Sequence, residues 1–156
     1  MIKRLKKGIV AVIAAGSLVL GFGTPNAYAA SYTDYGPASF ATEDGKYELT
    51  IKTTSVEKNV TITLGGLYRV NRKSGSVTYI NGDVSALSVR LCNASTGNCT
   101  AFKSFRQVDG GAYFSNMKPG TFYVDIRDSL ADYYFKGTVY GKTHSWDSNE
   151  CPIECY

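Results

Sequence analysis

Apolar and polar residues alternate along most of the chain after residue 45. Tyr47, Leu49 and Ile51 alternate with charged or hydroxyl-bearing residues, and the same pattern recurs at 60–64, 87–91 and 122–126. A period of two places one set of side chains on one face of a half-buried strand. The spacing of an amphipathic helix is not sustained anywhere after the first thirty residues. The pattern therefore predicts β-strands.

Turn signals separate these alternating segments. They are Asn81-Gly82-Asp83, Asp109-Gly110-Gly111 and Lys118-Pro119-Gly120. Short strands divided by regular turns are typical of an antiparallel β-sandwich or jelly roll. The sequence thus predicts an all-β, disulfide-bonded fold of about eight strands, near 46–55, 58–70, 77–81, 84–92, 99–107, 112–116, 121–127 and 133–140.

The first 29 residues have the features of a bacterial secretory signal peptide. Four cations between Lys3 and Lys7 precede an uncharged run at 8–23, and Ala27-Tyr28-Ala29 supplies the small residues of a cleavage site. An uncleaved membrane anchor would need about 20 strongly apolar residues, and this run is shorter and rich in glycine. We therefore predict a secreted protein with no membrane span after cleavage.

The rest of the chain divides into three parts. Residues 30–45 show no periodicity and are predicted to be an irregular lead-in. Residues 46–141 form the predicted sandwich domain, and residues 142–156 form a C-terminal tail tied by disulfides. A chain of this length suits one domain with a single core.

Removing the signal peptide changes the charge balance. The whole chain has 17 Lys+Arg against 13 Asp+Glu, a net charge of +4, and all four excess cations lie in the signal peptide. The remaining chain is electrically neutral overall. Nucleic-acid binding depends on a surplus of cations that displace phosphate counterions, so no nucleic-acid partner is predicted.

The four cysteines of a small secreted domain are most simply explained as two disulfides. Cys92 and Cys99 flank the polar loop NASTGN, which favours a local bridge between them because a short loop costs little entropy to close. Cys151 and Cys155 would then pair with each other. The alternative joins one of these tail cysteines to Cys92 or Cys99.

The tail also contains residue types that bind zinc. His144, Cys151 and Cys155, with Asp147 or Glu150, would form such a site. The spacing repeats no known zinc finger, and thiols oxidise in an extracellular space. The tail cysteines are therefore predicted to form a disulfide, and no metal or other cofactor is predicted.

Enzymatic chemistry has few candidates in this sequence. His144 is the single histidine, and neither G-x-S-x-G nor H-E-x-x-H occurs. Asp125, Asp128 and Asp132 would have to supply a glycosidase-type carboxylate pair or a calcium site. Asp128 and Asp132 frame a turn, where aspartate more often caps the backbone, and His144 is expected to be a plain surface residue. No enzymatic activity is predicted.

Aromatic residues are the most suggestive functional feature. Tyr123 lies on the polar side of the predicted strand 121–127. On the predicted strand 133–140, either Tyr134 and Tyr140 or their neighbours Tyr133 and Phe135 face outward. On the outside of a sheet they would offer a stacking platform for sugar rings or an apolar patch for a protein. The alternative is that these tyrosines bridge the core and water. Asn93 and Asn98, in the bridged loop, are further candidate ligand contacts, because a constrained loop binds with a smaller ordering cost.

Residues 87–141 resemble the bacterial pre-peptidase C-terminal (PPC-like) domain, a small secreted β-sandwich. A polar hairpin is followed by a Gly-Gly turn, a strand GTFYVDIRD opened by Lys118-Pro119-Gly120, and a final aromatic strand YYFKGTVYG. In that family the domain is usually appended to hydrolases. The resemblance implies a sandwich fold and a non-catalytic accessory or binding role.

These observations together predict a small, secreted, non-catalytic binding protein acting at or outside the cell envelope. Its ligand would be a polysaccharide, a wall polymer or another secreted protein. The alternative is a secreted antagonist, such as a bacteriocin-like toxin or a protease inhibitor. A carboxylate-dependent hydrolase is the least favoured alternative.

Overall fold

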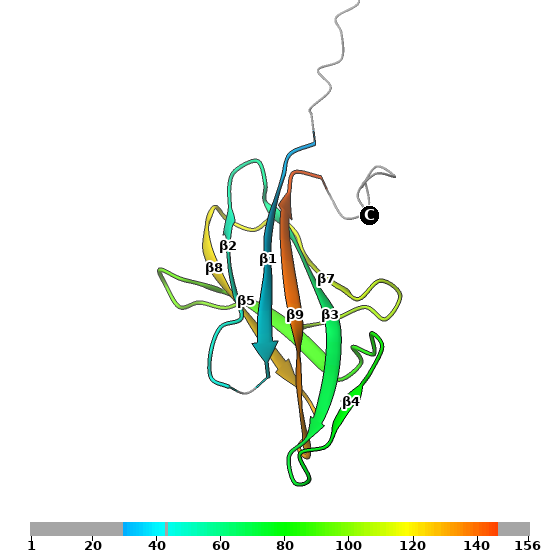
Figure 1. The fold of residues 1–156 in the computed structure, drawn as a ribbon. Coiled ribbons are helices and arrows are strands. Elements are labelled where there is room, and N and C mark those ends of the chain that lie inside the picture. The colour runs from blue at the N-terminus through cyan, green and yellow to red at the C-terminus, as the bar shows by residue number, and fades with distance from the viewer. Residues whose placement is uncertain (1–29, 43, 147–156) are drawn as a thin grey trace, which may run out of the picture.

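The computed structural model describes residues 30–42 and 44–146. These residues form two antiparallel β-sheets that pack as a sandwich, with no helix (Figure 1). Because the described residues contain no helix, none of them forms a helical membrane span. The strands are β1 (Tyr32–Ala41), β2 (Leu49–Thr53), β3 (Asn59–Asn71), β4 (Val77–Tyr79), β5 (Leu87–Asn93), β6 (Lys103–Ser104), β7 (Gly111–Phe114), β8 (Gly120–Asp128) and β9 (Tyr133–His144).

The chain passes repeatedly between the two sheets. One sheet has the order β1-β9-β3-β4, with β7 also paired to β3, and the other has the order β2-β8-β5-β6. β3 pairs with β9 along one side and with both β7 and β4 along the other. We call these the five-stranded and the four-stranded sheet.

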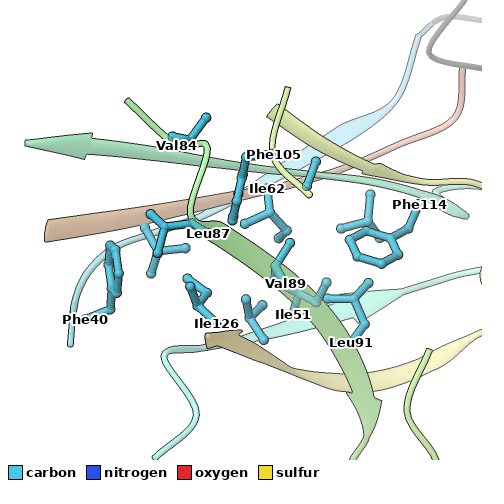
Figure 2. Packing of buried hydrophobic residues seen from close by; sticks show 14 of the residues in the cluster. Phe40, Ile51, Ile62, Val84, Leu87, Val89, Leu91, Phe105, Phe114 and Ile126 are labelled. Carbon is cyan, nitrogen blue, oxygen red and sulfur yellow. The ribbon is translucent and has the colours of Figure 1, made fainter. Parts of the chain in front are cut away.

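The core lies between the two sheets. Alternate residues of β8 (Phe122, Val124 and Ile126) are buried, and their neighbours are not. Figure 2 shows Ile62 of β3 and Ile126 of β8 approaching the same layer from opposite sheets. Each such side chain stabilises the fold by about 1.5–3 kcal/mol on burial, so the period-two pattern gives the sandwich its stability.

The prediction of an irregular lead-in at 30–45 is wrong for residues 32–41. This segment forms β1, which pairs with β9 at the edge of the five-stranded sheet. Most of β1 is exposed and only Phe40 is buried, so its sequence carries no alternation. The register shifts between Tyr35 and Ala38, and Pro37, which has no amide hydrogen, is tolerated at such an edge position.

Two other predicted boundaries also change. Of the strand expected at 99–107, only Lys103–Ser104 is in a sheet. β9 continues past residue 140 to His144, so the first part of the predicted tail belongs to the sheet. The remaining expected strands overlap the observed ones.

Candidate functional site

A groove of about 500 Å³ lies on the outer face of the five-stranded sheet. Residues 39–41 of β1 form one side and residues 136–138 of β9 form the floor. Gly66 and Tyr68 of β3 form the other side, and Asp44 lines the groove from the loop after β1. The site is thus built from segments at both ends of the described chain and from its middle.

Strand register explains why these residues meet. Ala41, Lys136 and Tyr68 lie opposite one another across β1, β9 and β3. Residues directly opposite in antiparallel strands project from the same face of the sheet. The groove therefore crosses three neighbouring strands.

A bulge in β3 shapes the far side of the groove. Between Gly65 and Tyr68 the pairing with β9 shifts, so that Gly66 and Leu67 together oppose the single residue Gly137. Gly66 has φ +57°, a left-handed conformation that glycine adopts without strain. The extra residue of a bulge re-aims the side chains that follow it. Leu67 points into the core, and Tyr68 points out beside the groove.

One partly exposed tyrosine, Tyr68, lines the groove, and two others, Tyr79 and Tyr140, lie near it without lining it. The rings of Tyr68 and Tyr79 lie 5.3 Å apart with an interplanar angle of 57°. Tyr140 lies over Gly65, where an added Cβ would be 3.4 Å from its ring. These three side chains are 39, 57 and 43% exposed, respectively. The adjacent rings of Tyr68 and Tyr79 thus form one exposed aromatic pair at the side of the groove.

Polar side chains also line the groove. Ser39 and Thr138 bring hydroxyl groups, Lys136 an ammonium group and Asp44 a carboxylate. Asp44 accepts a hydrogen bond from the Lys46 amide at 2.9 Å. No ion pair joins Lys136 to a carboxylate within the described part of the chain. The groove therefore combines one exposed aromatic ring, that of Tyr68, with hydrogen-bond donors and acceptors.

The three candidate tyrosines do not share one platform. Tyr134 and Tyr140 project from the outer face of the five-stranded sheet, and the guanidinium of Arg72 lies 5.7 Å from the Tyr134 ring. Tyr123 belongs to β8 of the other sheet and faces away from the core. The two outer faces of a sandwich point in opposite directions, so Tyr123 is separated from the other two.

The predicted local disulfide between Cys92 and Cys99 is confirmed. Within its loop, the side-chain oxygen of Asn93 accepts hydrogen bonds from the amides of Ser95 and Thr96, both at 3.0 Å. The Asn93 oxygen therefore helps to build the loop, whereas Asn98 is exposed. Cys151 and Cys155 lie outside the described residues, and their pairing stays a prediction.

The three aspartates considered for catalysis each have a structural partner. Asp125 pairs with Arg90 at 2.6 Å, and Asp132 with Lys73 at 3.1 Å. Asp128 accepts hydrogen bonds from the Thr42 hydroxyl and, at 2.9 Å, from the Leu130 amide. Within residues 30–42 and 44–146, no group of three or more His, Cys, Asp or Glu side chains is placed to hold a metal ion.

The expectation that His144 is a plain surface residue is wrong. Its side chain is 3% exposed, because β9 extends far enough to place it between neighbouring strands. Its Nε2 lies 3.0 Å from the Thr61 hydroxyl and its Nδ1 lies 2.8 Å from the Trp146 carbonyl. The Trp146 ring stacks on the imidazole at 4.6 Å. The cysteines of the zinc alternative lie outside the described residues.

Sequence reasoning missed Glu48, which directly precedes β2. Its amide donates to the Val124 carbonyl at 3.0 Å, and its carboxyl accepts from the Ile126 amide at 3.1 Å. Burial raises the pKa of this carboxyl to about 8, and the nearby Asp125 adds to the effect. In the sequence Glu48 is only one polar member of an alternating segment, so no local signal distinguishes it.

Comparison with known proteins does not place the chain in a family. No family model matches it, and no curated protein is significantly similar to it. The fold and the site define its class: an antiparallel β-sandwich with a groove of aromatic and polar residues on one outer face.

Proposed function

We propose that this protein is a small secreted binding protein without catalysis of its own, acting at or outside the cell envelope. We propose further that its ligand is a polysaccharide bound in the groove of the five-stranded sheet. The observation that carries this proposal is the exposed Tyr68 ring, which lines a groove that also contains hydroxyl and charged side chains and lies 5.3 Å from the exposed ring of Tyr79.

The chemistry of the groove matches that of a sugar ring. A sugar has apolar C–H faces and hydroxyl groups around its edge. Tyrosine combines an apolar ring with a polar tip, and so it can stack on the face of a sugar and bond to its edge. The hydroxyls of Ser39 and Thr138 and the charged tips of Asp44 and Lys136 offer further partners. A few placed polar groups beside apolar walls are what orients a ligand in a site.

Two features of the sequence support the extracellular setting. Residues 1–29 have the organisation of a secretory signal. The Cys92–Cys99 disulfide is of the kind that persists in oxidising compartments. The resemblance of residues 87–141 to the PPC-like domain also implies a non-catalytic accessory role.

Sedimentation with insoluble polysaccharides tests the proposal. The purified protein is mixed with cellulose, chitin or peptidoglycan, and the bound fraction is measured. We expect retention on at least one polymer, and we expect the double variant Tyr68→Ala/Tyr79→Ala to bind about tenfold more weakly, since each lost aromatic contact costs about 0.5–1.5 kcal/mol.

Tyr32→Ala is the matched control, because Tyr32 is equally accessible at 56% exposure and does not line the groove. It should be retained like the wild type. Retention on no polymer, or equal retention of the wild type and the double variant, would contradict the proposal.

A secreted antagonist, such as a bacteriocin-like toxin or a protease inhibitor, is a second candidate because of the bridged loop. Residues 94–99 are exposed, and the disulfide and internal hydrogen bonds hold them in one conformation. A rigid projecting loop inserts into a partner at small entropic cost. Growth-inhibition and protease-inhibition assays with residues 94–98 replaced by Gly-Ser would reveal this role as activity that depends on the loop.

A further inference from the structure

The outer face of the four-stranded sheet carries a second aromatic surface. The rings of Tyr47 and Tyr123 stack 4.7 Å apart and nearly parallel, at 11°. Tyr47 is 53% exposed. Thr50 and Cys92 flank Tyr123 on the neighbouring strands, so the stacked pair lies over the middle of the sheet and next to the bridged loop.

Cations lie on both sides of this aromatic pair. Lys52 pairs in register with Thr121 at one end of β8, and Arg127 pairs with Ser88 toward the other end. Strand residues rise about 3.3 Å each, so the two cations are separated by about 20 Å along β8 with the tyrosines between them. An extended polymer lying along β8 would meet a cation, the rings and a second cation in turn.

The carboxylates on this face do not neutralise these cations. Asp125 is paired with Arg90 at 2.6 Å. Arg127 lies 3.6 Å over the Phe102 ring and donates to the Ser88 hydroxyl at 3.2 Å. In the part of the chain that the structure describes, no carboxylate forms an ion pair with Lys52 or Arg127. On this face the cations Lys52, Arg90 and Arg127 outnumber the carboxylates Asp125 and Glu48. This face therefore has a net positive charge, although the chain without its predicted signal peptide has a net charge of zero.

We propose that this face, formed by Tyr47 and Tyr123 between Lys52 and Arg127, is a second binding surface and that it takes an acidic polysaccharide. The rings stack on sugar faces, and the two cations bind carboxylate, phosphate or sulfate groups along the polymer. The choice of a sugar ligand rests on the proposed function, whereas the acidic character follows from the charge of this face. The surface lies on the opposite side of the sandwich from the groove, so one molecule has two sites.

The test uses matched ligands that differ only in charge. A fluorescent oligogalacturonate and the same oligosaccharide with methyl-esterified carboxylates are titrated with the full secreted protein. We expect the acidic form to bind at least about tenfold more tightly at low salt, and we expect this preference to shrink as salt screens the charges. Lys52→Gln/Arg127→Gln should remove the preference, and Tyr47→Ala should weaken both ligands.

The groove variant Tyr68→Ala/Tyr79→Ala serves as the control and should leave acidic binding unchanged. Equal binding of the two oligosaccharides, or loss of acidic binding in the groove variant alone, would overturn the second surface. Tighter binding of a single-stranded oligonucleotide of equal charge would overturn the sugar assignment, because stacked aromatics beside cations also bind nucleic acid.

The sedimentation assay separates the two proposals. In one outcome, Lys52→Gln/Arg127→Gln and the wild type are retained equally on a neutral polymer, and the wild type does not bind oligogalacturonate. The proposal of a second surface is then wrong, and the groove proposal stands. If the wild type binds oligogalacturonate through Tyr47 and Arg127 but is retained on no neutral polymer, the groove proposal is wrong and the second surface stands.

Discussion

At the scale of single residues, two glycines determine the shape of the groove. Gly66 adopts its left-handed conformation in open space, with nothing within 4 Å of an added Cβ. Gly137 is confined instead: an added Cβ would lie 2.9 Å from the Gly65 carbonyl oxygen and 2.9 Å from the Leu67 side chain. The bulge thus needs one glycine for its backbone conformation and the other for close approach of the strands.

Alanine substitutions should separate these two requirements. Gly66→Ala should lower the free energy of unfolding by about 1 kcal/mol, the cost of a left-handed alanine. Gly137→Ala should lower it by about 1–3 kcal/mol, because the bulge must move to relieve the clash. Urea unfolding of both variants measures the difference. A Gly137→Ala protein as stable as the wild type would show that the bulge is not tightly packed.

Glu48 should make stability depend on pH. Its pKa is raised from 4.5 to about 8 in the folded protein, so the folded state holds a proton that the unfolded state releases. The stabilisation from this group is therefore complete below pH 4.5 and is lost as the pH rises toward about 8. The loss should be on the order of 1 kcal/mol, since the carboxyl is only partly shielded from solvent.

Urea midpoints at about pH 5 and about pH 8.5 measure this dependence. Other groups titrate too, so the comparison is with Glu48→Gln, which keeps the shape of the side chain but does not ionise. The variant should lose less stability than the wild type over this interval. Identical pH dependence in the two proteins would refute the assignment to Glu48.

At the scale of elements, the edges of the two sheets are secured in different ways. β1 is anchored by Phe40, whose side chain is 5% exposed, and the remainder of β1 is mostly on the surface. The hairpin after β5 is closed covalently by Cys92–Cys99 and by internal hydrogen bonds. One edge thus depends on pairing with β9 and on the apolar contacts of Phe40, Tyr35 and Ala38, whereas the hairpin of the other sheet has a cross-link.

Truncating Phe40 should therefore loosen the whole edge strand. Phe40→Ala should cost about 3–5 kcal/mol of unfolding free energy, as for other buried aromatic residues. Tyr32→Ala, at the exposed end of the same strand, should cost less than about 1 kcal/mol. Hydrogen exchange of the β1 amides reports the effect locally. Unchanged protection of β1 in Phe40→Ala would mean that backbone pairing alone holds the strand.

Removing the cross-link should lower stability without abolishing the fold. The two cysteines are seven positions apart, and a loop of this size is worth about 2 kcal/mol in the loop-entropy model. Cys92→Ala/Cys99→Ala should lower the melting temperature while its far-ultraviolet circular dichroism stays that of a β-protein. A double variant that does not fold would show that the bridge is needed to form the hairpin.

At the scale of the whole molecule, the sandwich presents its two aromatic surfaces on opposite sides. The inner faces share one core, so residues such as Tyr123 and Tyr140 point away from each other. A protein with one glycan site per face would bridge two polymer chains.

Bridging gives a prediction distinct from binding. Mixing the protein with a long, partly acidic polysaccharide should produce turbidity that passes through a maximum as the protein is increased, because excess protein saturates each chain separately. The groove variant and Tyr47→Ala should each remove the turbidity while each still binds through its intact face. Turbidity that survives in either variant would argue for self-association instead.

The sequence alone determined the fold class and one local cross-link. Period-two alternation shows which side chains of a strand lie on its apolar face, so β2, β3, β5 and β8 were predictable from their own residues. The bridge between Cys92 and Cys99 was predictable because the loop between them is short.

Only the tertiary structure decided which strands and side chains meet. β1 gains its conformation from β9, and Ser31 at its start donates to Ser145, 114 positions away. The groove depends on the register of three such distant strands. The burial of His144 and the raised pKa of Glu48 likewise come from neighbours remote in the chain. Local sequence patterns show which face of a strand is apolar. The contacts of each outward-facing side chain depend instead on strand pairing, because the packing of the whole core determines which strands are neighbours.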